Sequence, residues 1–159
     1  NVRYDLWHEK GLIELTPGNV TDWRFVTRRI LELGKRFNIV EIGFDRWGAR
    51  DTAADLNENG LVAIDVGQGY QDLSAPSKRL ETLALSEKLV HNGHEILRWN
   101  IDCCRIISDP AGNIKPVKPE LKKSSKRIDG AVATVMALFS LMRHEGVSVY
   151  ETRGPLVFG

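Results

Sequence analysis

The sequence predicts a single α/β domain, because strand-like segments alternate with amphipathic helical segments along most of the chain. Its 159 residues are 42% hydrophobic and 27% charged, which is typical of a globular domain that buries its own core. The order strand, helix, strand, helix, strand, helix favours a sheet of parallel neighbouring strands covered by helices. No internal repeat, low-complexity tract or linker interrupts residues 1–159, so we expect one domain.

The first strand and the first helix are predicted near the N-terminus. Residues 11–16, GLIELT, alternate apolar and polar side chains and end at a Pro-Gly turn. Residues 19–37 then carry apolar side chains at three- and four-residue spacing, which predicts a helix capped by Asn19 or Thr21.

Two further strands are predicted in the middle of the chain. NIVEIGFD, residues 38–45, is nearly continuous in apolar character, as expected of a strand whose two faces are covered. A short helix over residues 48–58 ends at an Asn-Gly pair. Residues 61–69, LVAIDVGQG, then predict a third strand that leads into a glycine-containing loop.

The C-terminal half is predicted to be mainly helical. Residues 74–89 form an amphipathic segment that begins at a Ser-Ala-Pro cap. EILRW, residues 95–99, is expected to be a short extended piece, and residues 100–107 a short helix. The turn sequence SDPAGN also predicts an extended hairpin between RII and NIKPVK. Residues 127–144 predict a long helix ended by Gly146, with an apolar stripe formed by Ile128, Val132, Val135, Phe139 and Met142.

Several functional classes lack a sequence signal. No apolar run approaches the roughly 18 residues that span a bilayer, and the N-terminus has no signal-peptide pattern, so a cytoplasmic protein is the default expectation. Adjacent Cys103 and Cys104 cannot form a disulfide framework, and no C-x-x-C pair suggests zinc. No phosphate-binding G-x-x-x-x-G-K-[ST] loop or G-x-S-x-G nucleophile occurs. Only GQG and the scattered histidines would support a small-molecule α/β enzyme.

Asp45 ends the strand NIVEIGFD, and two interpretations of it stay open. Ligand and catalytic sites of open α/β sheets lie at the carboxyl ends of the strands, which is where Asp45 would be. Aspartate is also a favoured helix cap, and a helix is predicted to begin near Gly48. Spacing alone favours the cap.

Asp129 lies in KRIDGAVATVMAL, in the first turn of the last predicted helix. The helix dipole favours an acid there, so ordinary helix chemistry explains it. Ile128 and Val132 flank its face, however, so the carboxylate would point partly toward the sheet, and Gly130 leaves room for a close approach. A strand-end and a helix-start carboxylate together suit Mg²⁺ or Mn²⁺, hard cations that take oxygen ligands and keep waters and substrate phosphates.

The remaining candidates are weaker. Asp65 also follows a predicted strand and is favoured as a loop cap over a ligand, while Asp109 stands as a possible auxiliary acid. HNGH, His91–His94, has a spacing compatible with metal but predicts a turn.

Six Lys or Arg residues lie between Lys115 and Arg127 in a chain of net charge +1. Such a stretch is either a solvated loop or a set of phosphate contacts.

Six blocks of uncommon sequence occur in order along the chain. They are YDLWHEKGLIELTPGNVTDW, EIGFDRWGA, GQGYQDLSAPSKRLETL, HNGHEILRWN, DPAGNIKPVKP and KRIDGAVATVMAL. Together they resemble the C-terminal nuclease domain of the terminase large subunit of tailed bacteriophages. The resemblance runs from about Tyr4 to Leu141 and rests on several blocks instead of one short motif.

This resemblance implies a ribonuclease H-like fold, a mixed sheet with flanking helices, and an endonuclease that cuts concatemeric viral DNA when packaging begins and ends. It implies two Mg²⁺ or Mn²⁺ ions bound by a small cluster of acids, with hydrolysis by metal-activated water. Asp45 matches the acid of the FD strand end and Asp129 the acid of the IDG helix start, so both are predicted as catalytic metal ligands. The residues predicted to contact double-stranded DNA are Lys115, Lys118, Lys122, Lys123, Lys126 and Arg127.

One departure from the family pattern concerns the first acid, which lies on a strand ahead of the block matched by YDLWHEKG. We expect that strand, its aspartate and the ATPase domain to be absent from this chain, since Asp5, Glu14 and Asp22 do not match the family position. The chain is then a metal-dependent endonuclease domain, or a catalytically silent module that binds DNA or packaging partners. The resemblance implies the terminase small subunit and the portal protein as partners, in the cytoplasm of a bacterial host, with no membrane.

Overall fold

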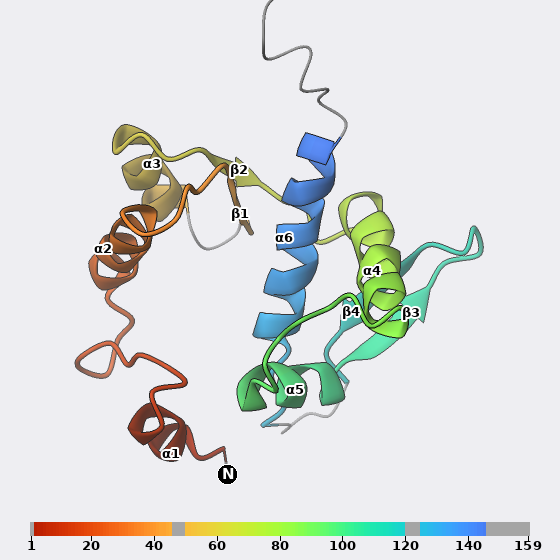
Figure 1. The fold of residues 1–159 in the computed structure, drawn as a ribbon, viewed down its shortest axis with the longest axis horizontal. Coiled ribbons are helices and arrows are strands. Elements are labelled where there is room, and N and C mark those ends of the chain that lie inside the picture. The colour runs from red at the N-terminus through yellow and green to blue at the C-terminus, as the bar shows by residue number, and fades with distance from the viewer. Residues whose placement is uncertain (1, 46–49, 120–124, 146–159) are drawn as a thin grey trace, which may run out of the picture.

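The structure, a computed structural model, describes residues 2–45, 50–119 and 125–145 (Figure 1). These residues form a mixed α/β arrangement, and no helix among them is long and apolar enough to cross a membrane. In chain order the elements are α1 (Tyr4–Glu9), α2 (Trp23–Gly34), β1 (Ile42–Phe44), α3 (Arg50–Glu58), β2 (Ala63–Asp65), α4 (Tyr70–Leu85), α5 (Glu95–Asp102), β3 (Arg105–Ser108), β4 (Ile114–Val117) and α6 (Asp129–Glu145).

The strands of the described residues form two separate two-stranded sheets. β1 and β2 are parallel, with Ile42 opposite Ala63 and Phe44 opposite Asp65, which confirms the prediction of parallel neighbours. β3 and β4 are antiparallel and form the predicted hairpin around SDPAGN. The expected single sheet of three strands is wrong. β1 and β2 are each three residues long, because strand pairing is confined to the stretch where the two segments run side by side.

The core forms where α6 packs between the parallel strands on one side and α4 and α5 on the other (Figure 1). Its buried cluster consists of Val66, Leu73, Val135 and Met136, each at most 8% exposed. Burying one such side chain contributes about 1.5–3 kcal/mol. The predicted stripe of α6 contains Val135 but not Met136, since the helix is buried on a second face, toward β1.

Gly43 is a residue at which β1 lies close to α6. A Cβ atom at this position would lie 2.9 Å from Val66 Cγ2, 3.4 Å from Ser140 Oγ and 3.6 Å from the backbone oxygen of Met136. The first of these distances is shorter than van der Waals contact allows. Glycine therefore makes room for the buried Val66 side chain between the strand and the helix.

The predicted strand at residues 11–16 is wrong, because this segment pairs with no strand among the described residues. Its backbone bonds to α1 instead, where the N–H of Leu12 donates to the Trp7 carbonyl oxygen at 2.8 Å. Glu14 pairs with Arg29 of α2 at 2.6 Å. Local contacts to two helices thus replace a strand ladder. The helix α1 itself was not predicted.

α2 begins at Trp23, later than the sequence pattern indicates, and ends at Gly34. The carboxylate of Asp22 accepts the N–H of Arg24 at 3.0 Å and caps the helix, so the predicted caps, Asn19 and Thr21, are wrong. The side chain adjacent to the first helical residue is the one placed to satisfy an otherwise unpaired backbone donor.

α4 begins at Tyr70, so its predicted start at residue 74 is wrong and the Ser-Ala-Pro sequence lies inside the helix. The carboxylate of Asp72 reaches back to the N–H of Gly67 at 2.7 Å, much as the acid of a capping box does. Pro76 costs the helix one backbone hydrogen bond. Its ring is buried in the packing of α4 and does not end the helix.

The two predictions around α5, an extended EILRW and a helix over residues 100–107, are both wrong. His94 Nδ1 accepts the N–H of Leu97 at 3.4 Å and caps α5. Trp99 packs against Trp7 of α1, with ring centroids 5.1 Å apart. A short apolar run does not reveal its own period, so these tertiary contacts decide in favour of the helix.

Two helix predictions are confirmed within the described residues. α3 ends at Glu58 and is followed by Gly60 at a φ of 82°, a left-handed conformation that glycine adopts without strain. Residues 48 and 49, the predicted start of this helix, lie outside the described residues. α6 begins at Asp129, and its predicted terminator, Gly146, also lies outside them.

We expect Gly43→Ala to lower the free energy of unfolding by about 1–3 kcal/mol, because the added methyl group would press on the buried Val66 side chain. Urea unfolding followed by circular dichroism measures the change. Gly34→Ala is the matched control, since a Cβ atom there meets Leu61 only at an ordinary 3.8 Å. Equal stabilities of the two variants would contradict the role assigned to Gly43.

Asp109 closes the hairpin turn. Its Oδ1 accepts the backbone N–H of Asn113 and its Oδ2 the side-chain amide of the same residue, both at 2.8 Å. The side-chain hydrogen bond, followed by the backbone one, holds the pKa of Asp109 below its usual 3.8. This acid, considered above as an auxiliary one, therefore has a structural role in the turn.

The lowered pKa predicts a pH dependence of stability. Because the folded pKa of Asp109 lies below its unfolded value, the carboxylate stabilises the hairpin above pH 3.8 and loses this effect as the pH falls further. We expect Asp109→Asn to flatten the acid limb of unfolding free energy against pH, by a small amount because solvent screens the group. Asp55→Asn, which removes an exposed acid from α3, is the control. An unchanged acid limb in Asp109→Asn would be the contrary result.

Candidate functional site

Asp45 and Asp65 mark the carboxyl edge of the parallel sheet. Phe44, the last residue of β1, lies opposite Asp65, the last residue of β2, and Asp45 follows Phe44 directly. Both acids are exposed. This edge is the part of a parallel sheet at which ligand sites form.

The two acids belong to opposite faces of the sheet. Gly43 faces α6, since a Cβ there would meet Ser140, and the buried Val66 lies on the same face. Side chains alternate along an extended strand, and continued alternation past the end of β1 would direct Asp45, two residues after Gly43, toward the side of α6. Asp65 directly precedes Val66 and is directed away from that side.

β1 runs antiparallel to α6. Glu41 lies beside His144 in the last turn of the helix, with Oε2 3.3 Å from Nε2. Further along the strand, Gly43 faces Ser140, about one turn earlier in the helix. The chain therefore moves toward the start of α6 as it approaches Asp45. Asp129 lies further along this direction, at the first residue of α6.

Asp129 is the first residue of α6, and its side chain is exposed. The N-terminal end of the helix dipole stabilises a carboxylate at this position. Met136, whose backbone oxygen lies at the β1 contact, is two turns further on, which is about 10 Å along the helix axis. Asp129 thus begins α6 about two turns before the residues that contact β1.

One residue that holds the start of α6 was not found from the sequence. Asn100, the buried asparagine of α5, accepts the N–H of Gly130 through Oδ1 at 2.6 Å. Only the fold reveals this contact, because it joins residues 30 positions apart. The one available signal is Gly130 itself, whose lack of a side chain leaves room for a close approach.

Asp45 and Asp129 together would supply only part of the ligands of a divalent cation. Carboxylate oxygens are the ligands that Mg²⁺ and Mn²⁺ prefer, with water and substrate phosphate as the others, so Asp45 and Asp129 have suitable chemistry. No group of three or more His, Cys, Asp or Glu side chains in the described part of the chain is arranged to hold a metal ion. The pair would therefore leave most coordination positions to water and substrate.

The predicted basic residues have different surroundings. Lys115, in β4, is half-buried: its Nζ donates to the Gln68 carbonyl oxygen at 2.9 Å and lies 5.2 Å from the ring centroid of Tyr70. Lys122 and Lys123 lie outside the described residues. The exposed members of the set are Lys118, Lys126 and Arg127.

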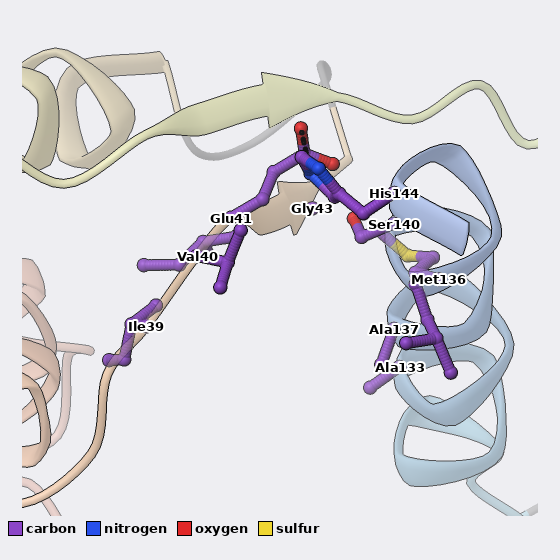
Figure 2. Close-up of a pocket in the computed structure, with 11 residues that line it drawn as sticks. Ile39, Val40, Glu41, Gly43, Ala133, Met136, Ala137, Ser140 and His144 are labelled. Atoms are coloured by element: carbon purple, nitrogen blue, oxygen red, sulfur yellow. Dashed lines mark hydrogen bonds and ion pairs between the residues drawn. The ribbon is translucent and has the colours of Figure 1, made fainter. Parts of the chain in front are cut away.

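A cavity of about 440 Å³ opens between the segment leading into β1 and the second half of α6 (Figure 2). Its helix side carries Ala133 and Ala137, and no predicted site residue lines it. The Glu41 side chain is 4% exposed and pairs with Arg143 at 3.6 Å and with His144 at 3.3 Å. Figure 2 shows Glu41 and His144 directed toward one another at one end of the cavity. These pairs fasten β1 to the last turn of α6.

The histidines of HNGH and the two cysteines contribute no site in the described part of the chain. HNGH forms the predicted turn, in which the N–H of His94 donates to the His91 carbonyl oxygen at 3.0 Å. Cys103 and Cys104 are both free thiols. Burial raises the pKa of Cys104, which makes its thiol less reactive.

A model of the terminase large subunit, endonuclease domain, matches residues 1–145. The chain is 34% identical over 137 residues to the terminase large subunit of Enterobacteria phage HK97, covering 85% of this chain and 27% of that protein. It is 32% identical over 143 residues to protein YmfN of Escherichia coli strain K12, covering 90% of this chain and 31% of YmfN. The chain thus spans less than a third of the length of these curated relatives.

Two solved structures resemble the fold. The crystal structure of the HK97 bacteriophage large terminase matches with a TM-score of 0.75 at 33% identity, over 87% of this chain and 29% of that one. The large terminase nuclease from thermophilic phage G20c matches with a TM-score of 0.59 at 13% identity, over 76% of this chain and 63% of that one. The second likeness concerns the fold alone. The resemblance drawn from the six sequence blocks is confirmed, and the chain belongs to the terminase large subunit family, as its endonuclease domain.

Proposed function

We propose that this chain is a metal-dependent DNA endonuclease module with a ribonuclease H-like fold, in which Asp45 and Asp129 bind Mg²⁺ or Mn²⁺. The observation that carries the proposal is the antiparallel course of β1 along α6, from Glu41 beside His144 to Gly43 beside Ser140. This course supports a placement of Asp45 on the side of α6, toward the half of the helix that begins with Asp129. Membership of an endonuclease family supports the reaction class.

The proposed reaction is hydrolysis of a phosphodiester bond. Divalent cations in such sites lower the pKa of a bound water and stabilise the leaving oxygen. Asp45 and Asp129 supply carboxylate oxygens, and their exposure leaves the site open to a DNA strand. The two acids come from a strand and a helix that pack on each other, and sites on such elements are held more precisely than sites on loops.

The proposed substrate is double-stranded DNA, held through its phosphates. Lys118, Lys126 and Arg127 are exposed close to Asp129 in the sequence, and basic side chains there would contact phosphates without reading bases. In a complete terminase, cutting of concatemeric viral DNA at the beginning and end of packaging follows from this activity. The small subunit and the portal protein are the partners we propose for that larger protein.

A second candidate function is a catalytically silent module that binds DNA or packaging partners. The observation in its favour is that the described residues contain no three-ligand group for a metal ion. Such a module would keep the fold and the basic surface without a working site. Binding of Mn²⁺ in the absence of DNA distinguishes it from the endonuclease.

We expect the purified chain to nick supercoiled plasmid DNA with Mn²⁺ and to lose this activity with EDTA. Asp45→Asn and Asp129→Asn should each lower the nicking rate by about 100-fold or more, because each removes a charged metal ligand. DNA binding should persist in both variants. Asp55→Asn removes an exposed acid from α3 and should leave the rate unchanged.

Each outcome of this experiment has a definite meaning. Cleavage at the wild-type rate in Asp129→Asn would exclude that residue as a ligand, and the same holds for Asp45→Asn. A folded wild-type chain that neither nicks DNA nor binds Mn²⁺ would leave the silent module as the function.

The basic surface is tested by the salt dependence of DNA binding. We expect the triple variant Lys118→Gln, Lys126→Gln and Arg127→Gln to reduce the slope of log affinity against log salt by about 2–3, roughly 0.9 for each phosphate that the variant no longer neutralises. Fluorescence anisotropy with a duplex oligonucleotide measures the slope. The control removes the same charge from exposed residues of α2 and its end, Arg24, Lys35 and Arg36. Equal slopes for the two triple variants would argue against a phosphate-binding surface before α6.

A further inference from the structure

The first turn of α6 is capped by a side chain from another helix. The first N–H groups of a helix have no partner within it, and a side chain at the preceding residue normally accepts from the second or third of them. In α6 that preceding residue is Ile128, whose carbonyl oxygen accepts the N–H of Val132 at 2.9 Å but whose side chain has no acceptor. The N–H of Gly130, the second residue of the helix, donates to Asn100 Oδ1 instead, at 2.6 Å.

Asn100 is built into α5 in a way that fixes this acceptor. The residue is 3% exposed, and its Nδ2 donates to the Ile96 carbonyl oxygen at 3.1 Å. The amide group is thus held at both ends, by α5 through its nitrogen and by α6 through its oxygen. A buried amide with both ends bonded has one orientation available to it.

Gly130 lets the two helices come this close. A Cβ atom at Gly130 would lie 3.2 Å from Asn100 Oδ1 and 3.5 Å from Asn100 Cγ, and the first of these distances is tighter than ordinary contact. Glycine inside a helix is unfavourable by itself. The close contact with Asn100 accounts for a glycine at this position, directly after the candidate ligand Asp129.

We propose that Asn100 is a positioning residue for Asp129: it replaces the missing local cap of α6 and fixes the turn that carries the carboxylate. The inference rests on the proposed function, since it takes Asp129 to be a metal ligand. Asp129 lies between Ile128 and Gly130, so the hydrogen bond that holds the Gly130 amide also holds the Asp129 backbone. Without it the first turn of α6 frays, and the Asp129 carboxylate no longer stays at one place.

The test uses the whole chain and the substitution Asn100→Leu, which keeps roughly the size of the side chain and removes its acceptor. We expect amides 130–133 to exchange with deuterium about tenfold faster or more, while the last turns of α6 keep their wild-type rates. Mn²⁺ affinity, measured by calorimetry without DNA, should weaken by about tenfold. Asn100→Asp keeps an acceptor oxygen and should restore the protection of the first turn.

Asn57→Leu is the matched control. Asn57 Oδ1 also accepts a backbone N–H, that of Ala63, at 2.9 Å, but on the side of β2 remote from its carboxyl end. Its loss should leave both the exchange of amides 130–133 and the Mn²⁺ affinity at wild-type values.

The possible results separate this inference from the proposed function. Wild-type exchange of the first turn in Asn100→Leu would overturn it, and so would a frayed turn with unchanged Mn²⁺ affinity, which would leave Asn100 a role in stability alone. A wild-type chain that binds no Mn²⁺ contradicts the proposed metal site itself. Weakened Mn²⁺ binding in Asn100→Leu, with normal binding in Asn57→Leu, supports both.

Discussion

The contact between β1 and α6 at Gly43 is the constraint on which the rest of the structure depends. A two-stranded parallel sheet is not stable by itself, and β1 and β2 are each three residues long. The pair persists because α6 lies directly against it and because Val66 is buried in the same contact. The same helix meets α4 and α5 on its other side. A side chain at position 43 would press on Val66, whose Cγ2 would lie 2.9 Å from a Cβ atom there.

The sequence indicated the fold class and the long regular elements, but not the short ones. The helices α3 and α6 and the hairpin follow from strong periodicity and from the SDPAGN turn, which act locally. The secondary structure of GLIELT and EILRW was predicted wrongly because a run of five or six residues fits both the strand period and the helix period. Contacts with residues far away in the chain decided their conformation. Trp7 packing on Trp99 is one such contact. The helix caps were predicted wrongly for a related reason. Asp22 and Asp72 have neighbours in the sequence that are equally suitable as caps.

The sequence predicted which residue types form the candidate site but not how they are arranged. Asp45 and Asp129 were found as acids at a strand end and a helix start, which are positions that sequence can identify. That β1 runs antiparallel to α6 follows from contacts between distant parts of the chain, such as Gly43 with Ser140. Asn100 could not be found in this way, because an asparagine inside a helix has no pattern that distinguishes it. Its role depends on the distance to Gly130, which only a fold provides.

Lys115 differs from its basic neighbours in the conformational freedom of its side chain. Its Nζ is held between the Gln68 carbonyl oxygen and the ring of Tyr70, so its long side chain has already lost most of its rotamers. An ammonium group has three donors, and the contact with Gln68 uses one. A phosphate that reached Lys115 would meet a charge that is already ordered, with little further loss of conformational entropy, whereas an exposed lysine gives up about 1.5–2 kcal/mol on being fixed. The hairpin that carries Lys115 thereby holds a preorganised positive charge beside the loop that leaves the parallel sheet.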